Sequence, residues 1–192
     1  DHINGAIKVK EAGISCSVYV MPGVGGKALS ENNSRETTRV LSRIAPDFVR
    51  LRTLEIFPGT GLDILRKNGS FIEASEEEVV REIRTIISNT EFETEIVSDS
   101  ATNLLNVNGR LPHDRDRMLQ IIDSYLDLTE REKIEFSLRS RIESFMGQYG
   151  GLSDDIYSML EPYIRSGMLY IENADDEDIT DITTAIKSKL MP

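Results

Sequence analysis

Cysteine, histidine and tryptophan are scarce or absent in this chain. Its 192 residues include one cysteine, two histidines and no tryptophan. A single cysteine excludes a framework of internal disulfides, and no group of Cys and His residues has the spacing of a metal site. No apolar run approaches the ~20 residues that span a bilayer, and no signal peptide is recognisable. We therefore expect a cytoplasmic protein without a membrane partner.

Basic residues are also in deficit. Lys and Arg number 22 against 33 Asp and Glu, which leaves a net charge of −11. An acidic surface repels phosphate backbones, so we expect no nucleic-acid partner. Aromatic residues make up 6% of the chain and hydrophobic residues 39%, so Leu, Ile and Val must fill the core of a globular protein. The chain begins with Asp1, inside what reads as a helix, and we expect a piece excised from a longer protein.

Hydrophobic periodicity and turn residues predict an α/β domain over residues 1–110. The predicted elements are a helix over 3–12, a strand over 14–21, a glycine-rich turn over 22–26, a helix over 30–45, a strand over 47–57, a helix that begins at a Ser75/Glu78 capping box, and a strand over 92–98. A helix separates the first two strands, which is typical of a βαβ unit. We therefore expect these strands to be parallel and their crossover to be right-handed.

Only helices are predicted after residue 110, so residues 111–192 form a separate helical region. The predicted helices cover 112–128, 130–147, 153–166 and 177–190, and Thr129 with Glu132 forms a second capping box. The acidic stretch 175–178 suits the positive end of the last helix dipole. A calcium loop is the alternative for this stretch, but it lacks the glycine that an EF-hand needs at its sixth position.

Strand alternation divides the side chains of the first two strands between two faces. One set is aliphatic and suits a face covered by helices: Cys16, Val18, Val20, Val49 and Leu51. The other set includes Tyr19, Met21, Arg50, Arg52, Leu54 and Ile56. Because arginine is rarely buried without an anionic partner, this second face is predicted to line a cleft, where Arg50 and Arg52 meet a carboxylate or phosphate. The alternative is that both arginines pair with carboxylates of this chain.

The glycine-rich turn can be compared with two phosphate-binding motifs, of which the sequence excludes one and matches the other in part. A P-loop is excluded because Met21 and Ala28 stand where it needs Gly and Ser or Thr. Residues 23–28 match the G-x-G-x-x-A fingerprint of dinucleotide-binding folds. However, the helix is predicted to begin near Ser30, too late to bind a pyrophosphate at this turn, and the acidic residue Glu55 comes later than the fingerprint expects.

Three segments resemble motifs of the radical SAM (S-adenosylmethionine) superfamily. Residues 19–26, Tyr-Val-Met-Pro-Gly-Val-Gly-Gly, are similar to the fifth-strand motif of these enzymes. Residues 52–60, Arg-Thr-Leu-Glu-Ile-Phe-Pro-Gly-Thr, are similar to their sixth strand and its exit turn. Residues 108–114, Asn-Gly-Arg-Leu-Pro-His-Asp, are similar to a segment after the core in members of the MiaB, NifB and coproporphyrinogen-oxidase type. The resemblance covers about residues 3–126.

The resemblance implies the C-terminal half of a partial (βα)6 TIM-like barrel with parallel strands, followed by an all-helical tail. In this family three cysteines of a C-x-x-x-C-x-x-C loop hold a [4Fe–4S] cluster, which reductively cleaves SAM to methionine and a deoxyadenosyl radical. This chain lacks the strands and the loop that carry the cluster, and Cys16 alone cannot replace three cysteines. We therefore expect an inactive fragment of an iron–sulfur oxidoreductase, with SAM and cluster bound only in the full-length parent.

The matched positions imply cofactor-binding residues but no catalytic residue. The ribose and methionine portions of SAM would lie against Tyr19, Met21, Gly23, Gly25 and Gly26. The adenine or the substrate would lie near Arg52, Leu54 and Ile56. Strand alternation independently turns five of these side chains toward one cleft. Val20 departs from the family, which often has glycine there, and this changes the expected ribose contact.

Half of a parallel barrel leaves one strand edge without a neighbour, and such an edge invites pairing with another chain. We expect the missing N-terminal half of the same protein to cover this edge. In the isolated chain, a second copy in a homodimer or the C-terminal helices would take its place. The alternative function is a non-catalytic α/β module that binds a nucleotide or another protein.

Overall fold

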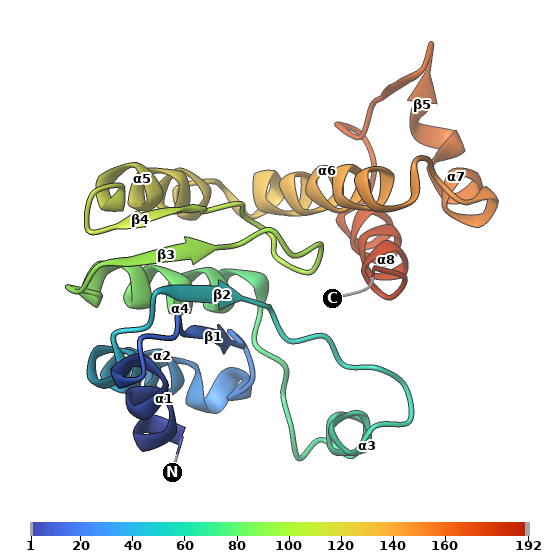
Figure 1. Cartoon of the computed structure of the whole chain (residues 1–192). Coiled ribbons are helices and arrows are strands. Elements are labelled where there is room, and N and C mark those ends of the chain that lie inside the picture. Colours follow the sequence, from blue (N-terminus) through green and yellow to red (C-terminus); the bar gives the residue numbers. More distant parts are fainter. Residues whose placement is uncertain (1, 191–192) are drawn as a thin grey trace. The chain divides into compact units, whose positions relative to one another are not determined.

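The structure, a computed structural model, describes residues 2–190 and divides into two compact units between Leu126 and Asp127. The elements of the first unit are α1 (His2–Glu11), β1 (Ser17–Val20), α2 (Gly26–Ile44), β2 (Phe48–Leu51), α3 (Gly61–Lys67), α4 (Glu76–Asn89), β3 (Thr94–Val97), β4 (Gly109–Leu111) and α5 (Arg115–Leu126). The four strands form one sheet in the order β1-β2-β3-β4 (Figure 1). The first three strands are parallel, and β4 is antiparallel to β3.

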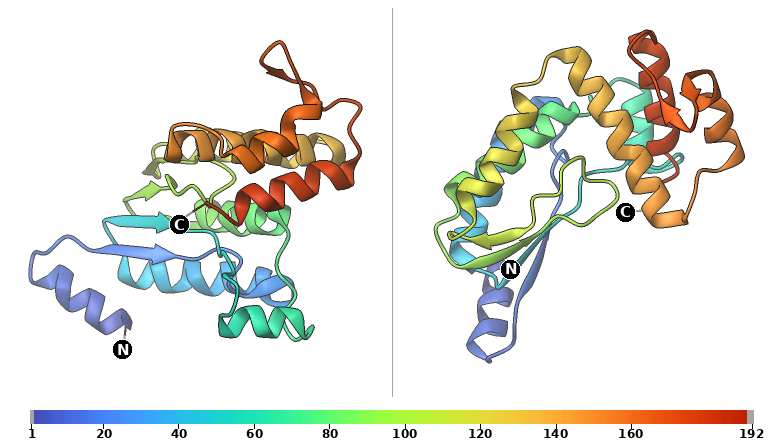
Figure 2. Two further views of the ribbon diagram at one scale, coloured as in Figure 1. Left: turned by 90° about the vertical axis from the view of Figure 1, so that its right-hand side faces the viewer. Right: turned by 90° about the horizontal axis from the view of Figure 1, so that it is seen from above.

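The helices of the first unit cover one face of this sheet. α2, α4 and α5 pack side by side on that face (Figure 2). The core between helices and sheet is aliphatic and includes Val20, Leu41, Val49, Leu51, Ile83, Ile87, Ile96, Leu111, Met118 and Ile122. The other face carries the alternate strand side chains, and we call it the open face.

The predicted α/β class and the parallel βαβ unit are confirmed, while a barrel is not. The strands of residues 2–190 that belong to this sheet form an open array of four with no barrel closure. The antiparallel β4 was not predicted, because three residues that begin with glycine and precede Pro112 give a weak strand signal. The first unit also ends later than the expected domain boundary at residue 110, since α5 packs against α4.

Two element boundaries differ from the prediction in ways that matter for the site. α2 begins at Gly26 rather than near residue 30, with Gly25 as its N-cap. β2 ends at Leu51 rather than at residue 57. Past that point the N–H of Thr53 bonds the side chain of Asn103, and the N–H of Leu54 bonds the carbonyl of Pro22. The main chain therefore leaves the sheet where the sequence still reads as a strand.

The short helix α3 follows the exit turn of β2 and was not predicted. The hydroxyl of Thr60 accepts the N–H of Asp63 and caps the helix. The Asp63 carboxylate accepts hydrogen bonds from Lys67 Nζ at 2.7 Å and from the Gly59 N–H at 2.9 Å. These bonds, that of Lys67 foremost, lower the pKa of Asp63 to about 2. The turn is thus fixed by a charged side chain of the helix that follows it.

The second unit contains α6 (Glu130–Tyr149), α7 (Asp154–Leu160), the 3-10 helix η1 (Glu161–Tyr163), strands β5 (Ile164–Arg165) and β6 (Met168–Leu169), and α8 (Asp176–Lys187). α6 packs against α8 through buried side chains that include Leu138, Phe145, Ile179, Ile182 and Ile186. The predicted helices over 130–147 and 177–190 are confirmed. The all-helical tail is wrong in one place, because β5 and β6 form a hairpin whose turn residues Ser166 and Gly167 have positive φ.

Residues 2–190 contain neither a metal-binding cluster nor a membrane-spanning helix. No group of three or more His, Cys, Asp or Glu side chains could hold a metal ion. In the acidic stretch, Asp176 pairs with Arg131, and Asp178 accepts a hydrogen bond from the Tyr163 hydroxyl. None of the helices in this part of the chain has both the length and the apolar character to cross a membrane.

Replacing Ser75 by Ala tests the capping box of α4. The Ser75 hydroxyl accepts the Glu78 N–H at 3.2 Å, and the Glu78 carboxylate accepts the Ser75 N–H at 2.7 Å. Loss of the cap should lower the free energy of unfolding by about 1 kcal/mol in urea titrations. Thr85→Ala in the middle of the same helix is the control and should be neutral or stabilising. Equal losses for both variants would contradict the assigned cap.

Candidate functional site

The carboxyl ends of the parallel strands are where open α/β sheets place their ligand sites. In this unit β1 runs into the glycine-rich turn, β2 into the irregular segment 52–60, and β3 into the loop 98–108. These three connections lie at the same end of the sheet, the carboxyl end of its strands, because the three strands are parallel. The candidate site is therefore this carboxyl end together with the adjoining part of the open face.

The strand register shows which side chains are neighbours on the open face. Tyr19, Arg50 and Val97 stand side by side on β1, β2 and β3. One step beyond the strands, Arg52 and Asp99 form an ion pair of 3.2 Å. Tyr19 is 65% exposed, so its ring is accessible to a ligand. The site thus combines an aromatic ring, two guanidinium groups and one carboxylate.

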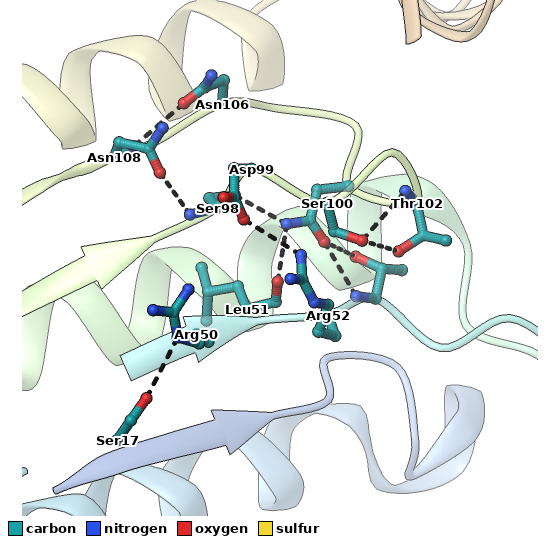
Figure 3. A network of polar contacts seen from close by, with 12 residues as sticks. Ser17, Arg50, Leu51, Arg52, Ser98, Asp99, Ser100, Thr102, Asn106 and Asn108 are labelled. Carbon is teal, nitrogen blue, oxygen red and sulfur yellow. Dashed lines mark hydrogen bonds and ion pairs between the residues drawn. The ribbon is translucent and has the colours of Figure 1, made fainter. Parts of the chain in front are cut away.

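Two arginines on this face have different partners, although the sequence predicted that both would meet a carboxylate or phosphate. The guanidinium of Arg52 bonds Asp99 and lies 5.8 Å from the centre of the Tyr19 ring. Arg50 donates from Nε to the Ser17 hydroxyl at 3.3 Å and has no carboxylate partner among the described residues (Figure 3). Pairing with the chain's own carboxylates therefore holds for Arg52 and fails for Arg50.

The buried side chain of Asn103 joins the ends of β2 and β3. Its Oδ1 accepts hydrogen bonds from the N–H and the hydroxyl of Thr53, both at 3.0 Å. Its Nδ2 donates to the carbonyl of Leu51 and to the hydroxyl of Ser98, both at 3.0 Å. The side-chain amide of Asn103 thus makes four hydrogen bonds around the site, two with main-chain groups and two with hydroxyl groups.

The loop that contains Asn103 is held by further polar contacts. The Ser98 N–H donates to the side chain of Asn108 (Figure 3). The Ser98 hydroxyl donates to the carbonyl of Leu105. Sequence reasoning missed this loop, although all six residues 98–103 are short polar residues or Ala directly after a parallel strand. That pattern is the signal that could have identified it, because such residues replace ladder bonds at strand ends. The network holds Asp99, and hence the Arg52 side chain that pairs with it, at the carboxyl end of the strands.

The three glycines of the turn are explained by packing within the chain. Gly26 has φ +60°, and a Cβ there would lie 2.6 Å from the carbonyl oxygen of Ile72 and 2.8 Å from the Phe71 ring. A Cβ on Gly23, which has φ +85°, would lie 3.1 Å from Val79, and a Cβ on Gly25 would crowd α2 itself. The turn therefore lets the segment around residues 71–72 and helix α4 approach closely.

A buried carboxylate closes the same turn. Glu82 of α4 is 2% exposed and accepts hydrogen bonds from the Gly23 N–H at 3.1 Å, the Ser30 hydroxyl at 2.6 Å and the Asn33 amide at 2.9 Å. The N–H of Lys27 donates to the Ile72 carbonyl. The helix does begin early enough to bind a pyrophosphate, contrary to the prediction, but the amides of Gly23, Gly26 and Lys27 already have partners within the chain. The dinucleotide fingerprint therefore has an intramolecular role here.

The other predicted site residues separate into two groups. Tyr19 and Met21 are exposed, and Arg52 is half-buried, so these three can meet a ligand. Leu54 and Ile56 are 8% and 6% exposed and lie in the core, contrary to the shared cleft that strand alternation predicted. The alternation fails there because β2 ends at Leu51. The buried free thiol of Cys16 fits the expected role of a small apolar side chain.

A groove of about 330 Å³ follows β1 on the side away from β2. β1 lines it with Val18, Tyr19 and Val20, the chain continues the lining with Met21, and α2 contributes Asn33, Glu36, Thr37, Val40 and Leu41. β1 is an edge strand, and it contains neither the charge nor the proline that commonly protects such an edge. The other edge, β4, carries Arg110 and ends before Pro112. One edge of the sheet is thus protected, and the edge beside the groove is not.

No protein-family model, curated protein or solved structure matches this chain. The radical SAM resemblance therefore depends on the three sequence segments alone.

Replacing Gly26 by Ala should damage the fold of the turn. Positive φ costs alanine about 1–2 kcal/mol, and the contact with the Ile72 carbonyl adds to this. We expect a loss of at least about 2 kcal/mol of unfolding free energy, measured by urea denaturation. Gly147→Ala in α6, where a Cβ would meet nothing within 4 Å, is the control and should be stabilising or neutral. A neutral Gly26→Ala would refute the packing explanation.

Replacing Asn103 by Ala should loosen the loop at the candidate site. The change leaves the Thr53 N–H and the Leu51 carbonyl buried without their partner, which costs about 2–4 kcal/mol. Amide hydrogen exchange should accelerate over residues 98–108. Asn106→Ala, at an exposed position of the same loop, should change stability by less than about 0.5 kcal/mol. Unchanged exchange in Asn103→Ala would show that the amide does not hold the loop.

Proposed function

We propose that this chain is the C-terminal part of a radical SAM iron–sulfur oxidoreductase and that the open face supplies part of its SAM pocket. The three motif segments support the family, since they occur in family order. The observation that carries the proposal is that Tyr19, Met21 and Arg52 come together, accessible, at the carboxyl ends of β1 and β2. The sequence resemblance places Tyr19 and Met21 against SAM, and Arg52 near the adenine or the substrate.

The residues fit SAM in part and do not fit the cluster. An exposed tyrosine ring with an arginine beside it can stack a planar base, and Met21 adds apolar contact. Gly23, Gly25 and Gly26 are proposed to shape the turn that holds Met21, without contacting SAM themselves. Leu54 and Ile56 are proposed to support the pocket from the core. Cys16 is a single buried thiol, so the ligands of a [4Fe–4S] cluster must lie outside this chain.

The isolated chain is proposed to be inactive, because the cluster of the full-length parent would supply the electron that cleaves SAM. The missing N-terminal half would complete the half barrel by adding a strand along the unprotected edge of β1. In the isolated chain a homodimer through the same edge would take its place. The parent is proposed to be cytoplasmic.

A non-catalytic interaction module is the second candidate function. The unprotected edge of β1 and the groove beside it favour this reading, because a strand from a different protein would satisfy the same main-chain groups. Dinucleotide binding at the turn is disfavoured by the closed arrangement around Glu82. The coding sequence that precedes Asp1 distinguishes the two candidates.

The reading frame upstream of Asp1 should encode a C-x-x-x-C-x-x-C loop about 100–200 residues before it, given about 30 residues per βα unit. In the complete protein, reconstituted with iron and sulfide and reduced, SAM should be cleaved to 5′-deoxyadenosine. Tyr19→Ala and Arg52→Gln should each raise the KM for SAM by about tenfold, which corresponds to about 1.4 kcal/mol. Arg43→Gln, at an exposed position of α2, is the matched control. A frame that starts near Asp1 without such a loop would refute the proposal and leave the interaction module.

A further inference from the structure

The open face carries more positive than negative charge in an otherwise acidic chain. Its arginines are Arg50, Arg52 and Arg110, and its carboxylates are Glu95 and Asp99. The chain as a whole has a net charge of −11. Because acidic residues are plentiful, an arginine that lacks a carboxylate on this face calls for a physical explanation.

Each of the other two arginines has a carboxylate within its neighbourhood. Arg52 is ion-paired with Asp99. Arg110 stands directly opposite Glu95 in the register of β3 and β4, where opposite charges attract across the strands. Of these three arginines of residues 2–190, only Arg52 forms an ion pair; Arg110 stands directly opposite Glu95, whereas the residues directly opposite Arg50 are Tyr19 and Val97, which carry no carboxylate.

Arg50 occupies the centre of the open face and is half-buried there. It belongs to β2, which has a neighbour on both sides, and its register partners are Tyr19 and Val97. Its one hydrogen bond runs from Nε to the Ser17 hydroxyl at 3.3 Å, so the guanidinium group retains free donors. Two parallel N–H groups of arginine match the oxygen atoms of a carboxylate or phosphate.

The surroundings of Arg50 strengthen its attraction for an anion. Arg52 lies two residues along the same strand and adds positive charge on the same side, and Asp99 can neutralise only one of the two. Tyr19 is the register partner of Arg50 on β1, and it is 65% exposed, so its ring is accessible to a ligand bound at Arg50. An oxyanion at this place would satisfy the free donors and relieve the repulsion between the two guanidinium groups.

We propose that the open face binds the carboxylate or phosphate group of a small-molecule ligand through Arg50, with Tyr19 and Arg52 beside it. Arg50 itself is not among the residues proposed to contact SAM, whereas Tyr19 and Arg52 are shared with that proposed pocket. The anion site requires neither SAM nor the cluster and does not rest on the radical SAM assignment. It adds that the ligand of this sheet face is an anion.

The test titrates the 192-residue chain with pyrophosphate and, separately, with citrate at constant ionic strength, followed by amide NMR and calorimetry. We expect saturable binding of at least one probe with a dissociation constant of about 0.1–1 mM. Amides of β1, β2 and β3 near Arg50 should shift. The tighter probe identifies the anion as a phosphate or a carboxylate.

Variants separate this site from general attraction to basic residues. Arg50→Gln should weaken binding by at least about tenfold, and Arg50→Lys, which keeps the charge but loses the two-pronged geometry, by an intermediate factor. Arg110→Gln should change binding less than about twofold, because it faces Glu95. Thermal melting confirms that the variants fold. Absence of saturable binding of both probes, or equal losses in Arg50→Gln and Arg110→Gln, would overturn the proposal.

Discussion

Parallel strands need a neighbour at each edge and a cover on each face, and in the first unit this requirement is met on one side only. α2, α4 and α5 cover one face, and buried aliphatic side chains such as Val49 and Ile96 join them to the sheet. The opposite face holds Tyr19 and Arg50, and the outer edge of β1 has no partner strand. Parallel sheets are normally buried on both faces, so both candidate functions follow from the side that remains uncovered.

Alternation along the strands predicted the exposure of side chains correctly as far as the strands extend. Val20 and Leu51 are buried while Tyr19 is exposed, as a pleated strand between helices and an open face requires. The same rule failed for Leu54, because Asn103 takes the main-chain groups of Leu51 and Thr53 that a continuing strand would use. No local pattern in residues 47–57 reveals a partner located some fifty residues later, so the end of β2 was not predictable from the sequence.

The glycine-rich turn shows a second limit of sequence reasoning. Removing a Cβ permits a phosphate to approach the main chain, and it equally permits the approach of a carbonyl oxygen or a side chain of the same protein. In this chain the Ile72 carbonyl approaches Gly26, and the Glu82 carboxylate bonds Gly23. The spacing of the glycines is the same in either case. What distinguishes them is a buried acidic residue on α4, whose distance from the turn only the fold determines.

Charge on the open face can be compared with the composition of the whole chain. Acidic residues exceed basic ones in the chain, and on the open face Arg52 pairs with Asp99 while Arg110 stands opposite Glu95. Arg50, on a strand with a neighbour on each side, forms no ion pair with the described residues, and the residue as a whole is half-buried. Holding an unpaired cation in such a place costs free energy that an anionic ligand would return on binding. A ligand that places a planar group on Tyr19 and an anion on Arg50 would therefore use both features of this face at once.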